Sequence, residues 1–407
     1  MEWKEVRLGD VCEIYGRIGF RGYTTNDLVD TPKEGAISLS PKNIINGELN
    51  LDQCTYIKWD KYYESPEIMI NPNDIIITKT GSSVGRTTFV RRVVHPMTLN
   101  PQLVVLKNIS ENAEFLSYYI KSALFQSVLK SIVVGSAIPT LSQKNLANLI
   151  INVPKEVAYQ RRIASILSSL DRKIELNNKI NADLEEMAQA IFKNWFVDFE
   201  PFKDGKFVDS ELGMIPEGWK VGRLTEIASY MNGLAMQKFP PENNEDSLPV
   251  LKIKELGQGF CGTDSDRCSC NIKDECKIHN GDVIFSWSGT LLVDVWCGGD
   301  CGLNQHLFKV TSKDYPKWFY YYWTKHRLQE FIHIAKDKAV TMGHIKRGHL
   351  EEALVAIPDN DSMEKAHELF EPILSKMISL RLENSRLSTL RDTLLPRLMS
   401  GELEVPE

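Results

Sequence analysis

Residues 80–88 have a composition suited to phosphate binding, because two glycines and several hydroxyl side chains follow a run of β-branched residues. Only three residues separate Gly81 from Gly85, whereas the P-loop of nucleotide-hydrolysing proteins has four at this place. The chain also carries Arg86 where that pattern requires lysine. The segment therefore does not predict nucleotide hydrolysis.

Two other groups of residues resemble parts of catalytic sites. Asn71-Pro72 begins like the signature of amino-methyltransferases, but no aromatic residue follows that could stack on a target base. Asp266, with Glu275 and Lys277, resembles the acidic pair and lysine of metal-dependent nucleases, although such triplets are common in charged loops. His-Glu-x-x-His, Gly-x-Ser-x-Gly and glycine-rich cofactor loops are absent from the sequence. We therefore expect no catalytic residue, no catalytic metal and no cofactor in this chain.

The cysteines are concentrated in one region, since six of the eight lie between Cys261 and Cys301. Their spacing lacks the Cys-x-x-Cys pairs that make a zinc site convincing. Two interpretations stay open at this stage, a structural zinc site and a set of reduced thiols. The polar N-terminal residues do not form a secretory signal, which favours reduced thiols and a cytoplasmic protein.

Charge is distributed unevenly along the chain. The formal net charge of −6 argues against a uniformly basic nucleic-acid binder. Nevertheless, residues 75–110 and 115–155 contain no acidic residue while they carry several lysines and arginines. Residues 325–347 are also mainly basic. An acidic protein with such segments is expected to have basic faces able to contact phosphates.

Loops that mix basic, amide and hydroxyl side chains are the candidates for reading base edges in a DNA groove. Three such loops occur twice: residues 16–21 and 232–239, residues 79–86 and 287–290, and residues 138–144 and 341–347. The alternative for each loop is an ordinary glycine-rich turn. The candidate DNA-binding residues are Arg17, Arg21, Lys79, Thr80, Ser82, Ser83, Arg86, Arg91, Arg92, Thr140, Gln143, Lys144, Gln237, Lys238, Trp287, Ser288, Thr290, Thr341, His344, Lys346 and Arg347.

The elements that position these loops are predicted by an internal repeat about two hundred residues long. Its matches occur in the same order in both halves, which predicts two copies of one domain. They pair Trp3-Lys4 with Trp219-Lys220, Asp74-Ile75-Ile76 with Asp282-Val283-Ile284, Leu99-Asn100 with Leu303-Asn304, the aromatic stretch 115–119 with 319–322, and Val153-Pro154 with Ile357-Pro358.

Each half ends in a long predicted helix. From Ile163 to Trp195, and again from Phe370 to Leu398, seam residues follow one another at alternating spacings of four and three. Asn177 and Asn181 lie in the middle of the first seam, where they would fix the register at some cost in stability. The pattern predicts two helices that pair side by side and antiparallel, as a coiled coil.

The predicted fold class is therefore α+β. It consists of two tandem heads of mixed helix and strand, separated by two long helices, with a pseudo-twofold internal repeat. The predicted boundaries are residues 1–155 for the first head, 156–200 for the central helix, 201–218 for a linker, 219–359 for the second head, 360–400 for the C-terminal helix and 401–407 for a tail.

The chain resembles the specificity subunit of type I restriction-modification systems. The resemblance is carried by residues 189–201, Gln-Ala-Ile-Phe-Lys-Asn-Trp-Phe-Val-Asp-Phe-Glu-Pro, and by residues 212–219, 282–289 and 395–403. It spans essentially the whole sequence. The heads match mainly in their framework and differ where DNA would be read, and the cysteine-rich region has no counterpart that we can assign.

This resemblance implies a non-catalytic DNA-binding chain of a restriction system. Each head would be a target recognition domain that reads one half of a split double-stranded DNA site. The helices would set the spacing and dock two methyltransferase subunits, and a restriction and translocase subunit would cut the DNA. The methyl donor and ATP would then belong to those partners. Two rival hypotheses are a structural adaptor that binds proteins rather than DNA, and a metal-dependent nuclease.

Overall fold

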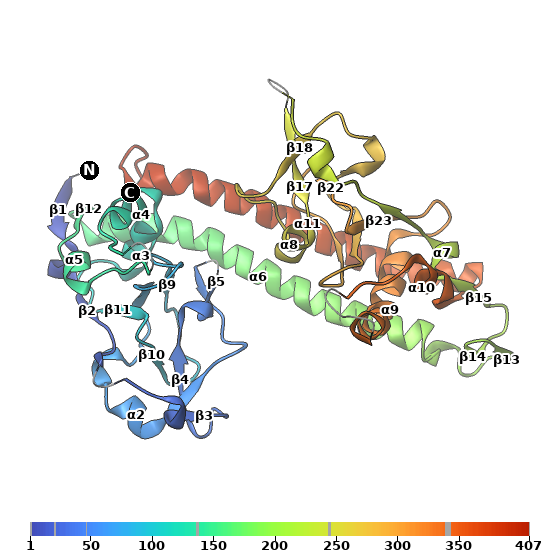
Figure 1. The fold of residues 1–407 in the computed structure, drawn as a ribbon, viewed down its shortest axis with the longest axis horizontal. Coiled ribbons are helices and arrows are strands. Elements are labelled where there is room, and N and C mark those ends of the chain that lie inside the picture. The colour runs from blue at the N-terminus through green and yellow to red at the C-terminus, as the bar shows by residue number, and fades with distance from the viewer. Residues whose placement is uncertain are drawn as a thin grey trace. The chain divides into compact units, whose positions relative to one another are not determined.

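The computed structural model describes residues 2–19, 22–45, 47–135, 138–242, 246–337 and 343–406. Its chain divides into two compact units, shown with their elements in Figure 1. The first unit comprises Met1–Arg172 together with Ser388–Glu407, and the second comprises Lys173–Leu387. Each unit therefore contains one predicted head and a part of both long helices.

The first unit contains two four-stranded sheets, with strand orders β2-β11-β8-β9 and β10-β4-β7-β3. The strands β1 and β12 pair separately and antiparallel. Its strands are β1 (Trp3–Arg7), β2 (Glu13–Tyr15), β3 (Leu28–Val29), β4 (Gly35–Leu39), β5 (Ile44–Ile45), β6 (Glu48–Leu49), β7 (Tyr56–Lys58), β8 (Ile75–Thr78), β9 (Thr87–Phe89), β10 (Met97–Leu99), β11 (Leu103–Lys107) and β12 (Ile150–Pro154). Its short helices are α1 (Leu8–Val11), α2 (Trp59–Tyr63), α3 (Ala113–Lys121), α4 (Ala123–Ser131) and α5 (Gln143–Ala147).

The second unit repeats this arrangement. Its sheets have the orders β16-β23-β20-β21 and β18-β17-β22-β19, and β15 pairs with β24 as β1 pairs with β12. Its strands are β13 (Phe207–Ser210), β14 (Gly213–Pro216), β15 (Lys220–Arg223), β16 (Ser229–Asn232), β17 (Ser247–Leu251), β18 (Arg267–Ser269), β19 (Lys277–Ile278), β20 (Val283–Ser286), β21 (Leu292–Val295), β22 (Cys301–Leu303), β23 (Leu307–Thr311) and β24 (Leu354–Ile357). Its shorter helices are α7 (Leu224–Ile227), α8 (Ile253–Gln258), α9 (Lys317–Asp337) and α10 (Arg347–Glu352).

A lysine–aspartate ion pair occurs at the same place in both units. Lys107 Nζ lies 2.6 Å from Asp74 Oδ2 in the first unit, and Lys309 Nζ lies 2.7 Å from Asp282 Oδ2 in the second. In each unit the lysine lies in a strand, β11 or β23, and the aspartate directly precedes the strand that pairs with it, β8 or β20. The sequence repeat is therefore a structural repeat that extends to buried charge.

The two long helices are α6 (Val157–Phe196) and α11 (Asn360–Met399), each of 40 residues. All residues of both predicted seams are buried or half-buried. Within the second unit the helices run antiparallel, since Asn177 Nδ2 donates to Asn384 Oδ1 at 2.9 Å, while Phe192 packs against Phe370 with ring centroids 6.2 Å apart. Both helices begin several residues before the predicted seams. Tyr159 in this early part of α6 is buried in one apolar cluster with residues of α3, and Ala366 of α11 is buried in another with residues of α9.

In the first unit the helix segments are joined to the head by a polar cluster. Asp171 on α6 accepts hydrogen bonds from Arg391 Nη1 of α11 at 2.8 Å and from Tyr118 Oη of α3 at 2.5 Å. In the second unit Glu185 occupies a comparable place, with Lys325 Nζ at 2.6 Å and Tyr321 Oη at 3.2 Å. Acidic residues of α6 therefore hold a helix of the head in each unit.

The segment predicted as a turn-rich linker contains ordered structure. Strands β13 and β14 form an antiparallel hairpin within residues 201–218. Trp219, which follows it, packs against Phe202 with ring centroids 4.9 Å apart. Aromatic side chains therefore hold the connection against its own unit, which turn-forming residues alone did not predict.

The cysteines are free thiols, and the pKa values of two of them are shifted in opposite directions. Burial raises the pKa of Cys297 to about 11, whereas a hydrogen bond from Cys301 lowers the pKa of Cys261.

Within the described part of the chain, no group of three or more His, Cys, Asp or Glu side chains could hold a metal ion. None of the described helices combines the length and apolarity that crossing a bilayer requires.

Candidate nucleic-acid interface

Two of the predicted loops meet in the first unit. Thr80 and Thr140 form an isolated antiparallel β-bridge. Around it the Gly81 amide donates to the Pro139 carbonyl at 2.9 Å, and the Leu141 amide donates to the Lys79 carbonyl at 2.8 Å. Residues 79–86 and 138–144 are therefore one composite surface, although about sixty residues separate them in sequence.

The corresponding loops meet in the same way in the second unit. Ser288 and His344 form the equivalent antiparallel bridge. The Gly289 amide donates to the Gly343 carbonyl at 2.9 Å, and the Ile345 amide donates to the Trp287 carbonyl at 3.0 Å. The pairing of loops is therefore part of the repeat. Of the candidate residues, Arg21 and Thr341 lie outside the described residues.

The first loop of each head is held by close backbone contacts. A Cβ at Gly16 would lie 2.6 Å from Gln143 Nε2, the movable end of that side chain, and 3.3 Å from the Leu103 carbonyl oxygen, so a larger residue would crowd this loop against the start of α5. A Cβ at Gly233 would lie 2.2 Å from the Leu303 carbonyl oxygen. The Leu234 amide donates to the Leu303 carbonyl at 2.9 Å. These glycines position the first loops beside the other elements of the site.

Arg17 is buried, whereas the prediction placed it on a surface that contacts DNA. Its side chain is only 4 % exposed. Its Nε donates to the Leu99 carbonyl at 2.9 Å, and its Nη2 donates to Thr98 Oγ1 at 3.1 Å. The guanidinium therefore ties the first loop to β10, and in this structure it is not available at the surface for a phosphate or a base.

The remaining candidates differ in exposure. Ser288 is buried, and its hydroxyl contacts His306 Nδ1 at 3.1 Å. Arg91 is half-buried and lies 3.7 Å from Glu114 Oε1, which partly neutralises it. The half-buried members are Lys79, Thr80, Ser83, Arg91, Thr140, Gln143 and Trp287, and the exposed members are Ser82, Arg86, Arg92, Lys144, Gln237, Lys238, Thr290, His344, Lys346 and Arg347.

Lys79 and Arg347 show how the loops hold positive charge. Burial lowers the pKa of Lys79, because its ammonium is partly removed from water. An anion beside it would restore the stability of the charged form. Arg347 is exposed and makes one long hydrogen bond, 3.4 Å from its Nη2 to the Tyr230 carbonyl. Much of its fork of donors therefore remains directed to solvent, where it could bind a phosphate or a guanine.

A fourth element belongs to the site in both units and was not among the predicted loops. Gln102 follows β10, and its carbonyl accepts from the Lys79 amide at 2.8 Å. His306 follows β22 and contacts the second loop through Ser288. Asn100 and Asn304 shape the two turns by accepting from the amides of Gln102 and His306. The repeated Leu-Asn pair is the sequence signal for this turn, which connects strands of two different sheets, but spacing does not indicate its proximity to the loops.

The chain combines two mixed α/β units, a loop cluster repeated in each unit, and two paired helices. Sequence comparison shows directly which family of proteins has these features. Residues 1–186 and 216–386 match the family model of the type I restriction modification DNA specificity domain. The two matched segments cover most of the chain and correspond to the two halves of the repeat. The protein therefore belongs to the family of type I restriction-modification DNA specificity proteins.

Individual relatives extend the likeness over the full length. The MjaIX specificity subunit of Methanocaldococcus jannaschii is 28% identical over 425 aligned positions, which cover 100% of this chain and 94% of the relative. The HindI specificity subunit of Haemophilus influenzae is 22% identical, covering 99% and 100%. A solved type I S subunit from M. genitalium shares the fold, with a TM-score of 0.52 at 16% identity over 98% of this chain and 96% of that one.

Proposed function

We propose that the protein is the DNA-specificity subunit of a type I restriction-modification complex and has no catalytic role itself. Each unit recognises one half of a bipartite double-stranded site. The observation that supports this most strongly is the repeated cluster of loops joined at the Thr80–Thr140 and Ser288–His344 bridges. Two copies of one reading surface suit a DNA site that is itself divided into two halves.

Within each cluster, we assign the candidate residues to phosphate contact or to base reading according to their side-chain chemistry. Exposed Arg92 and Lys144 in the first unit, and Lys346 in the second, supply charges that neutralise phosphates and position the duplex, whereas the exposed Arg86 is proposed to read a base edge. Thr290, like Ser82, supplies a hydroxyl that can read base edges. Apart from Arg17 and Ser288, 17 candidates lie among the described residues, and we propose that they act in these two ways, with Arg17 and Ser288 supporting the loops.

The paired helices serve as the spacer between the two DNA-reading units in this proposal. A helix of 40 residues is ~60 Å long at ~1.5 Å per residue, which exceeds the ~34 Å of one duplex turn. Asn177 and its bonds to α11 hold the register of that spacer. Changing helix length is therefore expected to change the gap between half-sites and leave the bases read unchanged.

The helices also provide the proposed docking surfaces for the methyltransferase subunits. Large apolar side chains on both helices remain exposed, namely Leu176 at 52% and Met187 at 44% on α6, and Leu369 at 42% on α11. Such side chains on a helix face suit a protein partner better than DNA. The restriction and translocase subunit would join the same complex, which acts on DNA in the cytoplasm.

The experiment that tests this function is selection of duplexes from a random library by the full-length chain, alone and with its methyltransferase subunit. We expect one bipartite motif, and an affinity that falls steeply with salt because counterions are released from neutralised phosphates. A protein-binding adaptor would instead select no motif, and its binding to partners would change little with salt. A metal-dependent nuclease would cut the library when the chain is incubated with Mg²⁺ alone.

A further inference from the structure

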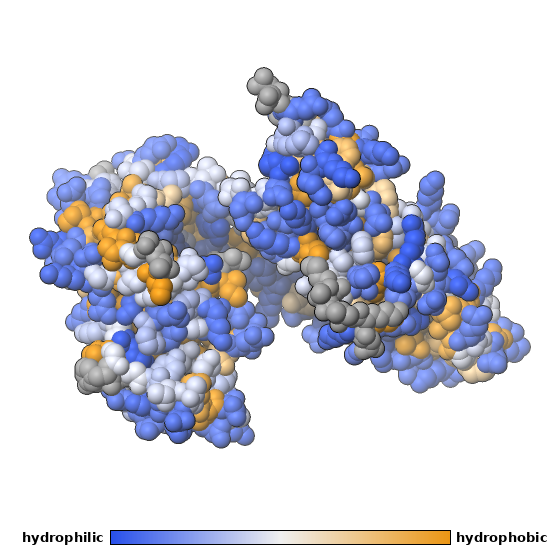
Figure 2. Space-filling view, viewed as in Figure 1, coloured by the Kyte–Doolittle hydropathy of each residue, from blue (hydrophilic) through white to orange (hydrophobic). Residues whose placement is uncertain are grey.

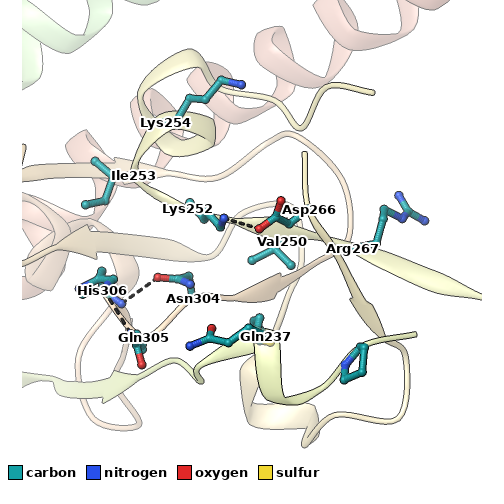
Figure 3. A pocket seen from close by; sticks show the side chains of 12 residues that line it. Gln237, Val250, Lys252, Ile253, Lys254, Asp266, Arg267, Asn304, Gln305 and His306 are labelled. Carbon is teal, nitrogen blue, oxygen red and sulfur yellow. Dashed lines mark hydrogen bonds and ion pairs between the residues drawn. The ribbon is translucent and has the colours of Figure 1, made fainter. Parts of the chain in front are cut away.

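A cleft with both polar and apolar lining lies in the second unit beside the loop cluster, with a volume of about 660 Å³. It is seen from close by in Figure 3, and the surface around β17 and β18 is mostly hydrophilic in Figure 2. Most of its lining lies outside the loops predicted from the sequence. The lining residues are Met236, Gln237, Pro240, Val250, Lys252, Ile253, Lys254, Asp266, Arg267, Asn304, Gln305 and His306.

One wall of the cleft carries two glutamine amides. The backbone amide of Gln305 donates to the Leu234 carbonyl at 2.9 Å, which fastens the turn between β22 and β23 to the first loop. Gln237 follows in a short 3-10 helix, Met236–Lys238, and the buried Met236 side chain anchors this helix in the core. Figure 3 shows the Gln237 side chain directed towards the turn that carries Gln305. The two side chains therefore project from backbone that is held at fixed positions.

The opposite wall is charged but largely neutralised. Lys252 is paired with Asp266, and Lys254 Nζ lies 2.6 Å from Asp264 Oδ2. Arg267 Nε donates to Ser247 Oγ at 3.0 Å. Because carboxylates accompany both lysines, this wall does not concentrate positive charge as a phosphate site would. The cleft instead offers hydrogen-bonding groups with a defined geometry.

His306 connects the cleft to the loops already described. Its Nδ1 contacts Ser288 Oγ at 3.1 Å, and its ring lies 6.0 Å from the Trp287 ring, centroid to centroid. Its Nε2 contacts Gln305 Nε2 at 3.3 Å. The glutamine-bearing wall is therefore continuous with the second and third loops. A duplex bound to those loops would present its base edges to this wall.

We propose that Gln305 and Gln237 are specificity-determining residues, and that the cleft reads an adenine-containing base pair in the half-site of the second unit. A glutamine amide donates to N7 and accepts from N6 of adenine in the major groove, and no other base presents that pair of groups. This inference rests on the proposed DNA-specificity function and names the chemistry of its second reading surface. Gln237 is exposed, and its side-chain amide makes no hydrogen bond to another described residue, which leaves both of its groups available for a base.

The experiment compares the motifs selected from a random duplex library by the full-length wild type, Gln305→Ala and Gln237→Ala. We expect at least one variant to lose about 5- to 150-fold of its preference for adenine at a single position of the second half-site. The first half-site should keep its preferences. Gln305→Glu or Gln237→Glu at the responsible position should move the preference towards cytosine, because a carboxylate accepts from cytosine N4.

The control is Gln329→Ala, since Gln329 is an exposed glutamine on α9 of the same unit and does not line the cleft. Thermal unfolding of every variant checks that the fold is retained. If the wild type selects a bipartite motif and neither cleft variant changes it, the cleft proposal is overturned while the function stands. If the wild type selects no motif, the proposed function fails and this inference fails with it.

Discussion

Replacing Asn181 by leucine should stabilise the second unit. Asn181 is only 8 % exposed in the seam of α6, and neither its Oδ1 nor its Nδ2 has a hydrogen-bond partner among the described residues. The neighbouring Asn177 is fully buried, but its Nδ2 donates to Asn384 Oδ1 at 2.9 Å and to Glu383 Oε2 at 2.8 Å. The two asparagines therefore form a matched pair that differs in hydrogen bonding.

The size of the effect follows from that difference. An unsatisfied buried amide costs ~1–3 kcal/mol, and leucine of similar size removes this cost while it adds apolar burial. We expect Asn181→Leu to raise the free energy of unfolding by ~1–3 kcal/mol. Asn177→Leu gains the same burial but loses two hydrogen bonds, one of them to a carboxylate, so it should remain ~1–3 kcal/mol less stable than Asn181→Leu.

Differential scanning calorimetry of the full-length variants measures this difference. For a unit of this size each kcal/mol moves the melting temperature by ~2–4 °C, so the transition that involves the second unit should rise by roughly 2–12 °C in Asn181→Leu. Size-exclusion chromatography checks that the variant keeps the oligomeric state of the wild type. A lower transition temperature in Asn181→Leu, or a higher one in Asn177→Leu than in Asn181→Leu, would refute the reasoning.

Three other substitutions or labels test separate parts of the structure. Arg86→Ala should weaken binding of the selected duplex by ~1–3 kcal/mol in competition assays and relax one position of the first half-site, whereas a uniform loss across sequences would make Arg86 a phosphate contact. The double variant Leu176→Glu/Met187→Glu should reduce co-purification of the methyltransferase subunit, while the chain alone keeps its affinity for DNA. If assembly with that subunit is unchanged, the docking surface lies elsewhere. At about pH 8, iodoacetamide should label Cys261 faster than Cys297, because the pKa of Cys261 is lowered and that of Cys297 is raised; mass spectrometry would reveal the opposite order.

Much of the architecture could be predicted from the sequence because it rests on periodic patterns. The alternating spacing from Ile163 to Trp195 indicated α6, and the repeated Asp-Ile/Val-Ile run indicated β8 and β20 at the same place in each half. The hairpin of β13 and β14 was missed because its stability comes from aromatic packing around Trp219. Turn-forming residues indicate where a chain can bend, but they do not show what the bend packs against.

The site was less predictable because its residues meet through tertiary contacts. The three loop pairs were found from composition, whereas the bridge between Thr80 and Thr140 depends on strand positions that spacing does not encode. Arg17 is a candidate because it lies in a loop suited to reading base edges, but its guanidinium donates to the Leu99 carbonyl and the Thr98 hydroxyl of β10. Gln305 is not predicted from the sequence, because a single glutamine in a turn carries no recognisable pattern until the fold places it in the same cleft as Gln237.

The most direct test of the central claim is a genome-wide map of methylated bases in cells that express this chain with its modification subunit. If each unit reads one half-site, the map should show a single motif made of two specific halves separated by a gap of fixed length. Methylation that requires this chain but follows no common sequence, or a motif without two separate halves, would contradict the assignment of one reading surface to each unit.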